Sequence, residues 1–303
     1  MSRLRSKRMK KISPSSDELI SFLTKFIGIV LVLLLLWSQN NLLITKEFVY
    51  EVPNISKELT GYKILHISDI SNTNINIYDK AKKTKPDIIV ISGGYADKNS
   101  NCNKSIEVVN KLSSIAPVYY IYNEEDKELG ITNILSSTAS NNILNSKTTI
   151  ANNVDLVGLD IDNNKDESEN KKSIYDIIGN DKSRLCIAVA TNEADIDTIS
   201  KTNVDIILLG NSNYMNETDS TKYSKGASAI NGTQLFISGG IGNSKNSPQF
   251  RIFNFPELQL ITLSDGSITN KSWLEKQLDK LFNSGIGTIF DGTELKEYKK
   301  TYN

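Results

Sequence analysis

Apolar positions divide the chain into one long N-terminal run and a body of short alternating segments. From residue 19 to residue 37 nearly every side chain is apolar. Nineteen helical residues rise about 28 Å, close to the thickness of a bilayer's hydrocarbon core. Lys25 lies near the start of the run, where its long side chain can reach the headgroups, and Trp37 suits the opposite interface. The run therefore predicts a single transmembrane helix over residues 19–38.

A cleaved signal peptide is the alternative interpretation of this run. The residues after Trp37 read Ser-Gln-Asn-Asn-Leu-Leu, without the small-x-small pattern of a cleavage site, which favours a retained anchor. Positively charged residues mark the cytoplasmic end of membrane helices. We therefore expect a basic cytoplasmic tail over residues 1–18, a cell-membrane location and an extracytoplasmic body. The first eleven residues hold no acidic residue and six basic ones, which are Arg3, Arg5, Lys7, Arg8, Lys10 and Lys11.

Beyond the anchor, apolar runs of the strand type alternate with mixed polar stretches. The runs at 88–91 and 206–209 are continuous rather than alternating, as in strands buried on both faces. Helical patterns lie between the runs, for example at 77–85 and 103–114. Strands that alternate with helices predict an α/β domain. The expected strands are 46–52, 63–68, 87–92, 118–122, 154–159, 184–190, 205–210, 234–238 and 258–263.

The distribution of charge along the chain bears on which class of molecule it binds. The chain has 35 basic and 35 acidic residues, so the six charges of the tail leave a net −6 on the remainder. A mildly acidic body argues against nucleic acid as the main partner. The polar stretches 161–172 and 211–224 are expected to be exposed loops.

Histidine and cysteine are scarce. The chain has one histidine, His66, which excludes a histidine-rich transition-metal site. Of the two cysteines, Cys102 and Cys186, the second lies in an apolar run that predicts a core position. A disulfide between them stays open for an extracytoplasmic domain.

A series of short blocks runs through the body in a fixed order. The first, at 63–71, is a strand-like run that ends Ser-Asp-Ile-Ser, and the second, at 85–97, contains Ser-Gly-Gly-Tyr-Ala-Asp. The others are 119–125, 157–160, 187–192, 205–213, 236–242, Arg251 and 255–258. This ordered set, over residues 46–263, resembles the calcineurin-like metallophosphoesterases. The branch with an N-terminal membrane anchor is the most similar.

The resemblance implies a four-layer α/β/β/α sandwich over residues 61–264, after a linker and lead-in strand over 39–60. In this family two divalent metals share a carboxylate and a hydroxide, and the cations activate the attacking water. Two of the seven implied ligand positions keep the family's residue, namely Asp69 and Asn123. The seven positions correspond here to Asp69, Ser71, Gly94, Asn123, Thr191, Asn211 and Asn213.

The five replaced positions predict a protein without the family's chemistry. Loss of one supporting partner can lower metal affinity about 10–100-fold, and here the bridging carboxylate and every imidazole are replaced. We therefore expect no catalytic residue and no bound cofactor. His66 lies three residues before Asp69, so strand alternation would place it on the opposite face as a structural residue. A weak Ca²⁺ or Mg²⁺ site from oxygen ligands is the alternative, with Asp69, Asp97, Asn123, Glu124 and Glu125 as its candidates.

Residues 265–303 extend beyond the family pattern. Apolar residues recur along one face of a helix predicted over 272–284, and Gly285 would end it. Packing onto the domain and binding to a partner are both open for this face. Its residues are Trp273, Leu274, Leu278, Leu281 and Phe282.

Three functions remain open on the sequence alone. The leading hypothesis is a non-catalytic, single-pass envelope protein with a binding or regulatory role toward a protein or another envelope ligand. The second is a phosphoesterase with an atypical oxygen-ligand cation site, acting on a phosphoester or a lipid-linked phosphate. The third is a structural envelope component.

The orientation of the anchor can be tested with reporters fused after Asn303. Because the basic residues precede the apolar run, we expect an alkaline phosphatase fused there to be active. A green fluorescent protein at the same place should stay dark, and one fused ahead of Met1 should fluoresce. The reverse pattern would place the body in the cytoplasm.

Overall fold

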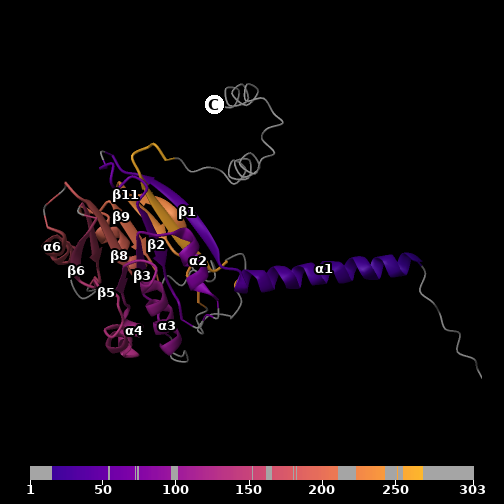
Figure 1. Cartoon of the computed structure of the whole chain (residues 1–303). Coiled ribbons are helices and arrows are strands. Elements are labelled where there is room, and N and C mark those ends of the chain that lie inside the picture. The colour runs from indigo at the N-terminus through magenta and orange to yellow at the C-terminus, as the bar shows by residue number, and fades with distance from the viewer. Residues whose placement is uncertain are drawn as a thin grey trace, which may run out of the picture.

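The protein is described by a computed structural model. It describes residues 16–53, 55–71, 73, 75–96, 102–151, 153–161, 166–179, 181, 183–210, 223–242, 251 and 255–268. Helix α1, Ser16–Asn41, stands away from the rest of the structure (Figure 1). Its segment Leu19–Asn41 contains an 18-residue stretch with a mean hydropathy of 2.7, so it is long and apolar enough to span a membrane.

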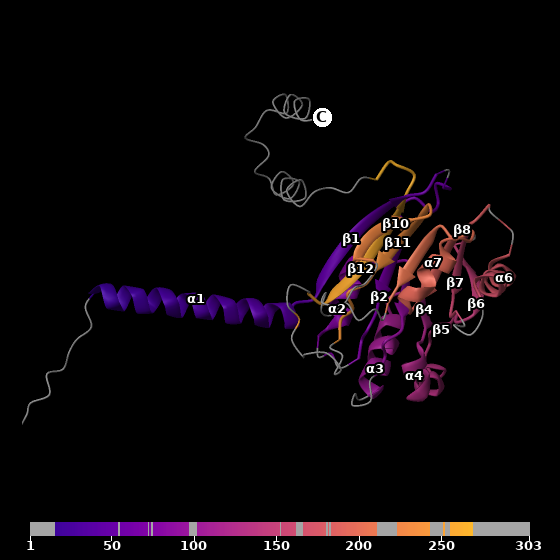
Figure 2. The same ribbon diagram turned by 180° about the vertical axis from the view of Figure 1, so that it is seen from behind.

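Two six-stranded mixed sheets form the domain (Figures 1 and 2). In the first sheet β1 is parallel to β12, β12 is antiparallel to β2, and β2, β3, β4 and β5 are parallel. In the second sheet the outer strands β10 and β6 are antiparallel to their neighbours and the inner four are parallel. The first sheet has the order β1 (Ile44–Glu51), β12 (Glu257–Ser264), β2 (Lys63–Ile67), β3 (Ile88–Ser92), β4 (Val118–Ile121) and β5 (Asn141–Asn142). The second has the order β10 (Gly226–Ile230), β11 (Thr233–Ile237), β9 (Ile206–Leu209), β8 (Leu185–Ala190), β7 (Val154–Gly158) and β6 (Ser146–Ile150).

Three hydrophobic clusters hold the elements together. Along β2, Leu65 and Ile67 face a cluster with the helices, whereas Ile64 faces a cluster shared with the second sheet, because successive strand residues point to opposite faces. The first cluster includes residues of α2 (Ile77–Thr84), α3 (Cys102–Ser113) and α5 (Ile131–Leu135). The third includes residues of α6 (Glu167–Ile178) and α7 (Ile196–Ile199) on the second sheet. Helices therefore cover the outer face of each sheet.

Every strand expected from the sequence is present within two residues of its expected bounds. The missed strands are β5, β6 and β10, whose largely exposed residues give no apolar run. The stretch 161–172 was expected to be a loop, but α6 begins within it at Glu167. Asp166 accepts a bond from the Glu169 amide at 2.9 Å, and the Glu169 carboxylate accepts from the Asp166 amide at 3.3 Å. This reciprocal cap starts a helix in a polar stretch that lacks apolar periodicity.

The two cysteines lie on different sides of the domain. Cys102 packs against the cluster on the outer face of the first sheet, and Cys186 belongs to the cluster on the outer face of the second. Both are free thiols, so the structure places them apart rather than in a disulfide.

The end of α1 is joined directly to the domain. The helix extends to Asn41, past the expected limit at residue 38, and only Leu42 and Leu43 separate it from β1. Gln39 is 2% exposed and Leu43 is 6% exposed. The side-chain oxygen of Asn40 accepts a hydrogen bond from the Arg251 amide at 2.9 Å. The first part of the expected linker at 39–60 is therefore helix and docked chain.

Candidate functional site

The loops after β2, β3 and β11 meet closely around Asp69. A β-carbon built at Gly94 would lie 2.5 Å from Asp69 Oδ1 and 2.6 Å from its Cα. One built at Gly240 would lie 2.7 Å from Asp69 Oδ2. Asp69 itself has a left-handed backbone with φ 52°, which Asp adopts more readily than most residues. The carboxylate is therefore enclosed by two backbone segments that come this close only because both residues are glycine.

The charge of Asp69 is opposed by a buried guanidinium from the same chain. Ser68 Oγ donates to Asp69 Oδ2 at 2.9 Å. Arg251 is fully buried and donates to the carbonyl oxygens of Gly239 and Gly242. Burial lowers the pKa of Arg251 to about 10, while the negative charges of Asp69 and Glu257 act in the opposite direction. The retained aspartate thus has a permanent cation for a neighbour.

Glu257, at the start of β12, extends this ionic group into the sheet. It is 1% exposed and forms an ion pair with Lys46 at 2.6 Å. Its Oε1 accepts hydrogen bonds from the Gly239 amide and from Gln259 Nε2, both at 3.0 Å. Because Gln259 also reaches His66, Glu257 links the ionic group to the polar residues between the sheets.

His66 lies within that polar group. Its Nδ1 lies 3.0 Å from Gln259 Oε1 and its Nε2 lies 2.7 Å from Ser92 Oγ. The ring is fully buried, and burial lowers its pKa to about 4, although the bond to Gln259 and the charge of Glu257 raise it in part. In the neutral ring one nitrogen donates a hydrogen bond and the other accepts one, so both nitrogens are bonded to protein groups.

Asn123 and Asp126 fasten the loop after β4 to the loop after β3. The Asn123 side chain accepts from the Asp126 amide at 2.7 Å and caps α4, Glu124–Glu128. The fully buried carboxylate of Asp126 accepts from the amides of Tyr95 (2.8 Å), Gly94 (3.0 Å), Ala96 (3.2 Å) and Asn123 (3.2 Å). Burial raises the pKa of Asp126 despite these bonds, which lower it. The sequence analysis missed Asp126, although the Asn-x-x-Asp spacing is that of a capping box.

The structure brings several of the implied ligand positions to one edge of the two sheets. The Ser71 amide donates to Gly94 O at 3.0 Å. The side-chain methyl group of Thr191 lies 3.0 Å from a β-carbon built at Gly93. Gly210, which follows β9, abuts Ser68 and Ser92. The ends of β2, β3, β8 and β9 therefore converge, and Asp69, Ser71, Gly94 and Thr191 lie at this convergence with the cap of α4.

Several candidates lie outside the described residues. They are Asp97, Asn211, Asn213 and the helix residues Trp273, Leu274, Leu278, Leu281 and Phe282. Of the candidate oxygen ligands that are described, Glu124 is exposed and bonded to Lys127 at 3.2 Å. Among the described residues, no group of three or more His, Cys, Asp or Glu side chains is placed to hold a metal ion.

The described residues do not fit the two-metal centre that the resemblance implies. A bridging carboxylate at position 94 would need its β-carbon within 2.6 Å of the Asp69 Cα, which no ordinary contact allows. Returning the carboxylate by Gly94→Asp would therefore displace Asp69 rather than complete a site. The Asn123 oxygen already accepts a hydrogen bond from a helix amide, and the positive charge of Arg251 acts on Asp69.

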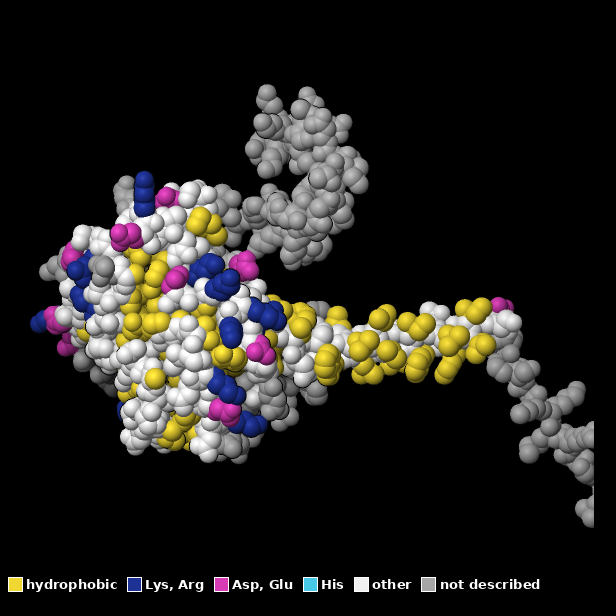
Figure 3. Space-filling view, viewed as in Figure 1, with side chains coloured by type: hydrophobic (Ala, Val, Ile, Leu, Met, Phe, Trp, Pro, Cys, Tyr) yellow, Lys and Arg dark blue, Asp and Glu magenta, His cyan; other side chains and the backbone are white. Residues whose placement is uncertain are grey.

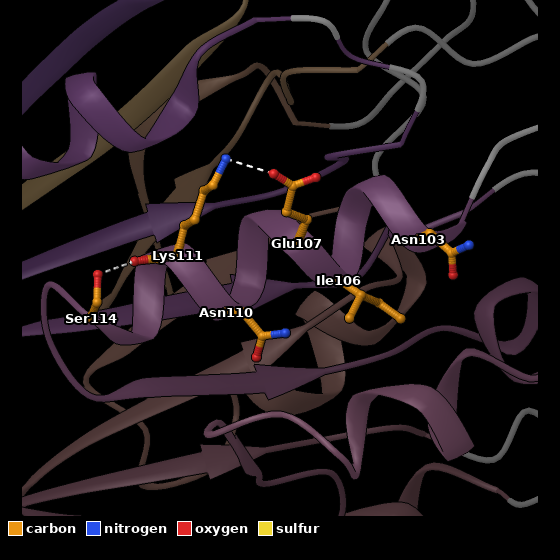
Figure 4. A pocket seen from close by; sticks show the side chains of 6 residues that line it. All are labelled: Asn103, Ile106, Glu107, Asn110, Lys111 and Ser114. Carbon is orange, nitrogen blue, oxygen red and sulfur yellow. Dashed lines mark hydrogen bonds and ion pairs between the residues drawn. The ribbon is translucent and has the colours of Figure 1, made fainter.

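Two surface hollows lie away from Asp69. One hollow, of about 540 Å³, lies along the exposed side of α3 (Figure 4). Two of its lining residues, Glu107 and Lys111, form an ion pair at 2.6 Å. All its lining residues come from α3 and the turn after it. The other, of about 270 Å³, lies between the end of β1 and the starts of β8 and β9, at the opposite edge of the sheets. Its charged lining residues are Arg184 and Asp205, and burial raises the pKa of Asp205.

Comparisons with known proteins assign no family to this chain. No family model matches the sequence, and no curated protein matches it. One solved crystal structure has a TM-score of 0.43 at 11% identity, covering 59% of this chain and 91% of its own. The protein TT1561 of Thermus thermophilus has a TM-score of 0.39 at 12% identity, covering 60% of this chain and 90% of its own. These likenesses are too distant to support a functional argument.

The packing around Asp69 predicts that Gly94→Ala is costly. The added methyl group meets the Asp69 backbone and must also adopt φ +77°. We expect the free energy of unfolding to fall by about 2–4 kcal/mol, from overpacking and backbone strain together. Urea denaturation of the full chain in detergent, followed by far-UV circular dichroism, measures the loss.

Gly130→Ala is the matched control for this substitution. Gly130 has φ +72°, but a β-carbon there meets nothing within 4 Å. It should therefore show only the backbone strain, about 1 kcal/mol. Equal losses for the two variants would mean that the loops around Asp69 are not tightly packed.

The burial of His66 predicts a distinctive titration. Its folded-state pKa lies below the unfolded value, so it contributes stability above pH 6.5 that is lost as the pH falls from 6.5 toward 4. The loss approaches about 3 kcal/mol at 1.36 kcal/mol per pKa unit. Because it is the only histidine in the sequence, its Cε1–H group gives a single NMR signal, which should stay nearly unchanged from pH 8 to pH 5. His66→Gln should lack this part of the pH dependence, and a midpoint near 6.5 would contradict the buried placement.

Proposed function

We propose that this chain is a membrane-anchored, non-catalytic relative of the calcineurin-like phosphoesterases with a binding or regulatory role at the cell envelope. In this proposal α1 spans the cell membrane once, with the N-terminus in the cytoplasm. The two sheets and their covering helices form the family's four-layer α/β/β/α sandwich. The partner is a protein or another envelope ligand and not a nucleic acid.

The order of the clusters supports the sandwich. One cluster lies between the first sheet and its helices, one between the two sheets, and one between the second sheet and its helices. The ends of two parallel strand pairs, β2 with β3 and β8 with β9, meet beside Asp69, and the ends of parallel strands are where loops bring ligands together in α/β proteins.

The observation that carries the loss of catalysis is the packing of Asp69 between Gly94 and Gly240. Metal-assisted hydrolysis needs carboxylates and imidazoles gathered around an open, solvated space. Here backbone segments lie within van der Waals contact of the retained carboxylate, and Arg251 supplies a fixed positive charge. A metal ion at Asp69 would be repelled by this buried positive charge, which weakens its binding.

A hydrolysis assay on the full chain tests this proposal. We expect no release of nitrophenol from bis-p-nitrophenyl phosphate above the protein-free rate with Mn²⁺, Mg²⁺, Ca²⁺ or Zn²⁺. Asp69→Asn should behave as the wild type does, because asparagine keeps the size of Asp69 and tolerates its left-handed backbone. A metal-dependent rate that falls about 100-fold in a folded Asp69→Asn variant would instead establish the atypical cation site, since ligating groups act as a unit.

The same variant distinguishes a binding role from a catalytic one in cells. Asp69→Asn should complement a deletion strain fully, whereas a form that lacks residues 1–40 should not, because it loses the proposed anchor. Asp166→Asn is the matched control, since it makes the same change at the cap of α6 and asparagine also caps a helix. Failure of Asp69→Asn at normal abundance, with Asp166→Asn active, would refute the non-catalytic role.

A further inference from the structure

The join between α1 and the domain determines which side of the domain lies next to the end of the apolar helix. Only Leu42 and Leu43 separate α1 from β1, and the Asn40–Arg251 bond fixes the last helical turn to the loop before β12. The turn 38–41 adds about 6 Å beyond the apolar run. The headgroup layer of one leaflet is about 5–8 Å thick. If α1 spans a membrane, as proposed above, the near side of the domain is held against the headgroups.

Helix α2 lies on that near side. β1 begins beside the start of β12, with Ile44 opposite Glu257, and β12 is antiparallel to β2, with Gln259 opposite His66. The end of β2, and the start of α2 that follows it, are therefore at the edge from which α1 leaves. Both ribbon views place α2 beside this junction and α6 on the far side (Figures 1 and 2).

The surface of α2 is strongly basic, although the body as a whole is acidic. Residues 77–85 contain four lysines and one aspartate, a net charge of +3. Lys82, Lys83 and Lys85 are exposed, and basic side chains gather over α2 next to the junction with α1 (Figure 3). Lys80 completes the group, which we call the α2 lysines.

The α2 lysines are not neutralised by the rest of the described structure. Some lysines on other helices pair with acids of their own helix, as Lys111 does with Glu107 and Lys171 with Glu167. None of the α2 lysines forms an ion pair with a described carboxylate. Asp79 is instead bonded to Asn76, the cap of α2, and Lys82 lies over the Tyr78 ring. Their charge is therefore available to an external anion.

We propose that the α2 lysines bind the anionic headgroups of the membrane in which α1 is anchored. Lysines beside a membrane anchor are attracted to a negative lipid surface, and this attraction acts within a Debye length of about 8–10 Å. The short join keeps α2 close to the membrane helix, so the α2 lysines are already near the headgroups without a separate binding step. The domain is thereby held in one orientation, with the Asp69 edge toward the lipid.

Lysine acetylation of the full chain in lipid nanodiscs tests this contact. Mass spectrometry gives the acetylation rate of each lysine, and Lys172 on α6 is the internal control because it is exposed on the far side. We expect Lys82, Lys83 and Lys85 to react at least about threefold more slowly with one-third phosphatidylglycerol than in pure phosphatidylcholine. Lys172 should not change, and about 0.5 M salt should remove the protection, because it shortens the Debye length to about 4 Å.

A charge-neutral variant and a soluble anion complete the test. Lys82→Gln/Lys83→Gln should abolish the protection of Lys85, whereas Lys171→Gln/Lys172→Gln should leave it intact. Inorganic phosphate added to phosphatidylcholine nanodiscs should give no protection. Equal rates at the α2 lysines in both lipids, or equal protection of Lys172, would overturn the proposal. A chain that stays soluble without detergent and enters no nanodisc would instead refute the membrane anchor itself.

Discussion

The close approach of three backbone segments around Asp69 is the constraint on which the edge of the domain depends. Gly94 and Gly240 allow their loops to contact the carboxylate and the backbone of Asp69, and any side chain at either position would push them apart. Arg251 then balances the charge from a fully buried position. The resulting edge is closely packed, and the charges of Asp69 and Arg251 act on each other within it.

The same ionic group connects the apolar helix to the interior of the domain. The Arg251 amide is bonded to Asn40 at the end of α1, and the charge of its guanidinium interacts with those of Asp69 and Glu257. Glu257 reaches Gln259, which reaches His66 between the two sheets. Buried polar groups that are all paired rigidify a structure, and an unpaired member is costly. The helix, the Asp69 edge and the centre of the first sheet are therefore held as one unit.

Because the membrane helix and the domain are held together, the uneven distribution of charge on the domain has a fixed direction relative to that helix. The body carries a net negative charge in sequence, yet the helix beside the anchor is basic and its lysines lack ion-pair partners among the described residues. A flexible join would let such a surface face any direction. A join of two residues gives it one direction, so that the α2 lysines and the Asp69 edge lie on the same side as the membrane helix.

The sequence by itself determined the elements whose signal is local. Long apolar runs predicted α1 and every buried strand, since a strand covered on both faces consists mainly of apolar residues. The pattern of apolar residues did not predict β5, β6 and β10, which are strands because they pair with a neighbouring strand. It also did not predict the start of α6, which is set by a polar cap. At the site, the sequence placed Asp69, Gly94 and Asn123 in neighbouring loops but left a cation cluster open. Only the tertiary structure decided that Asn123 and Asp126 fasten two loops together and that the charge of Arg251 acts on Asp69, because these interactions join segments that are far apart along the chain.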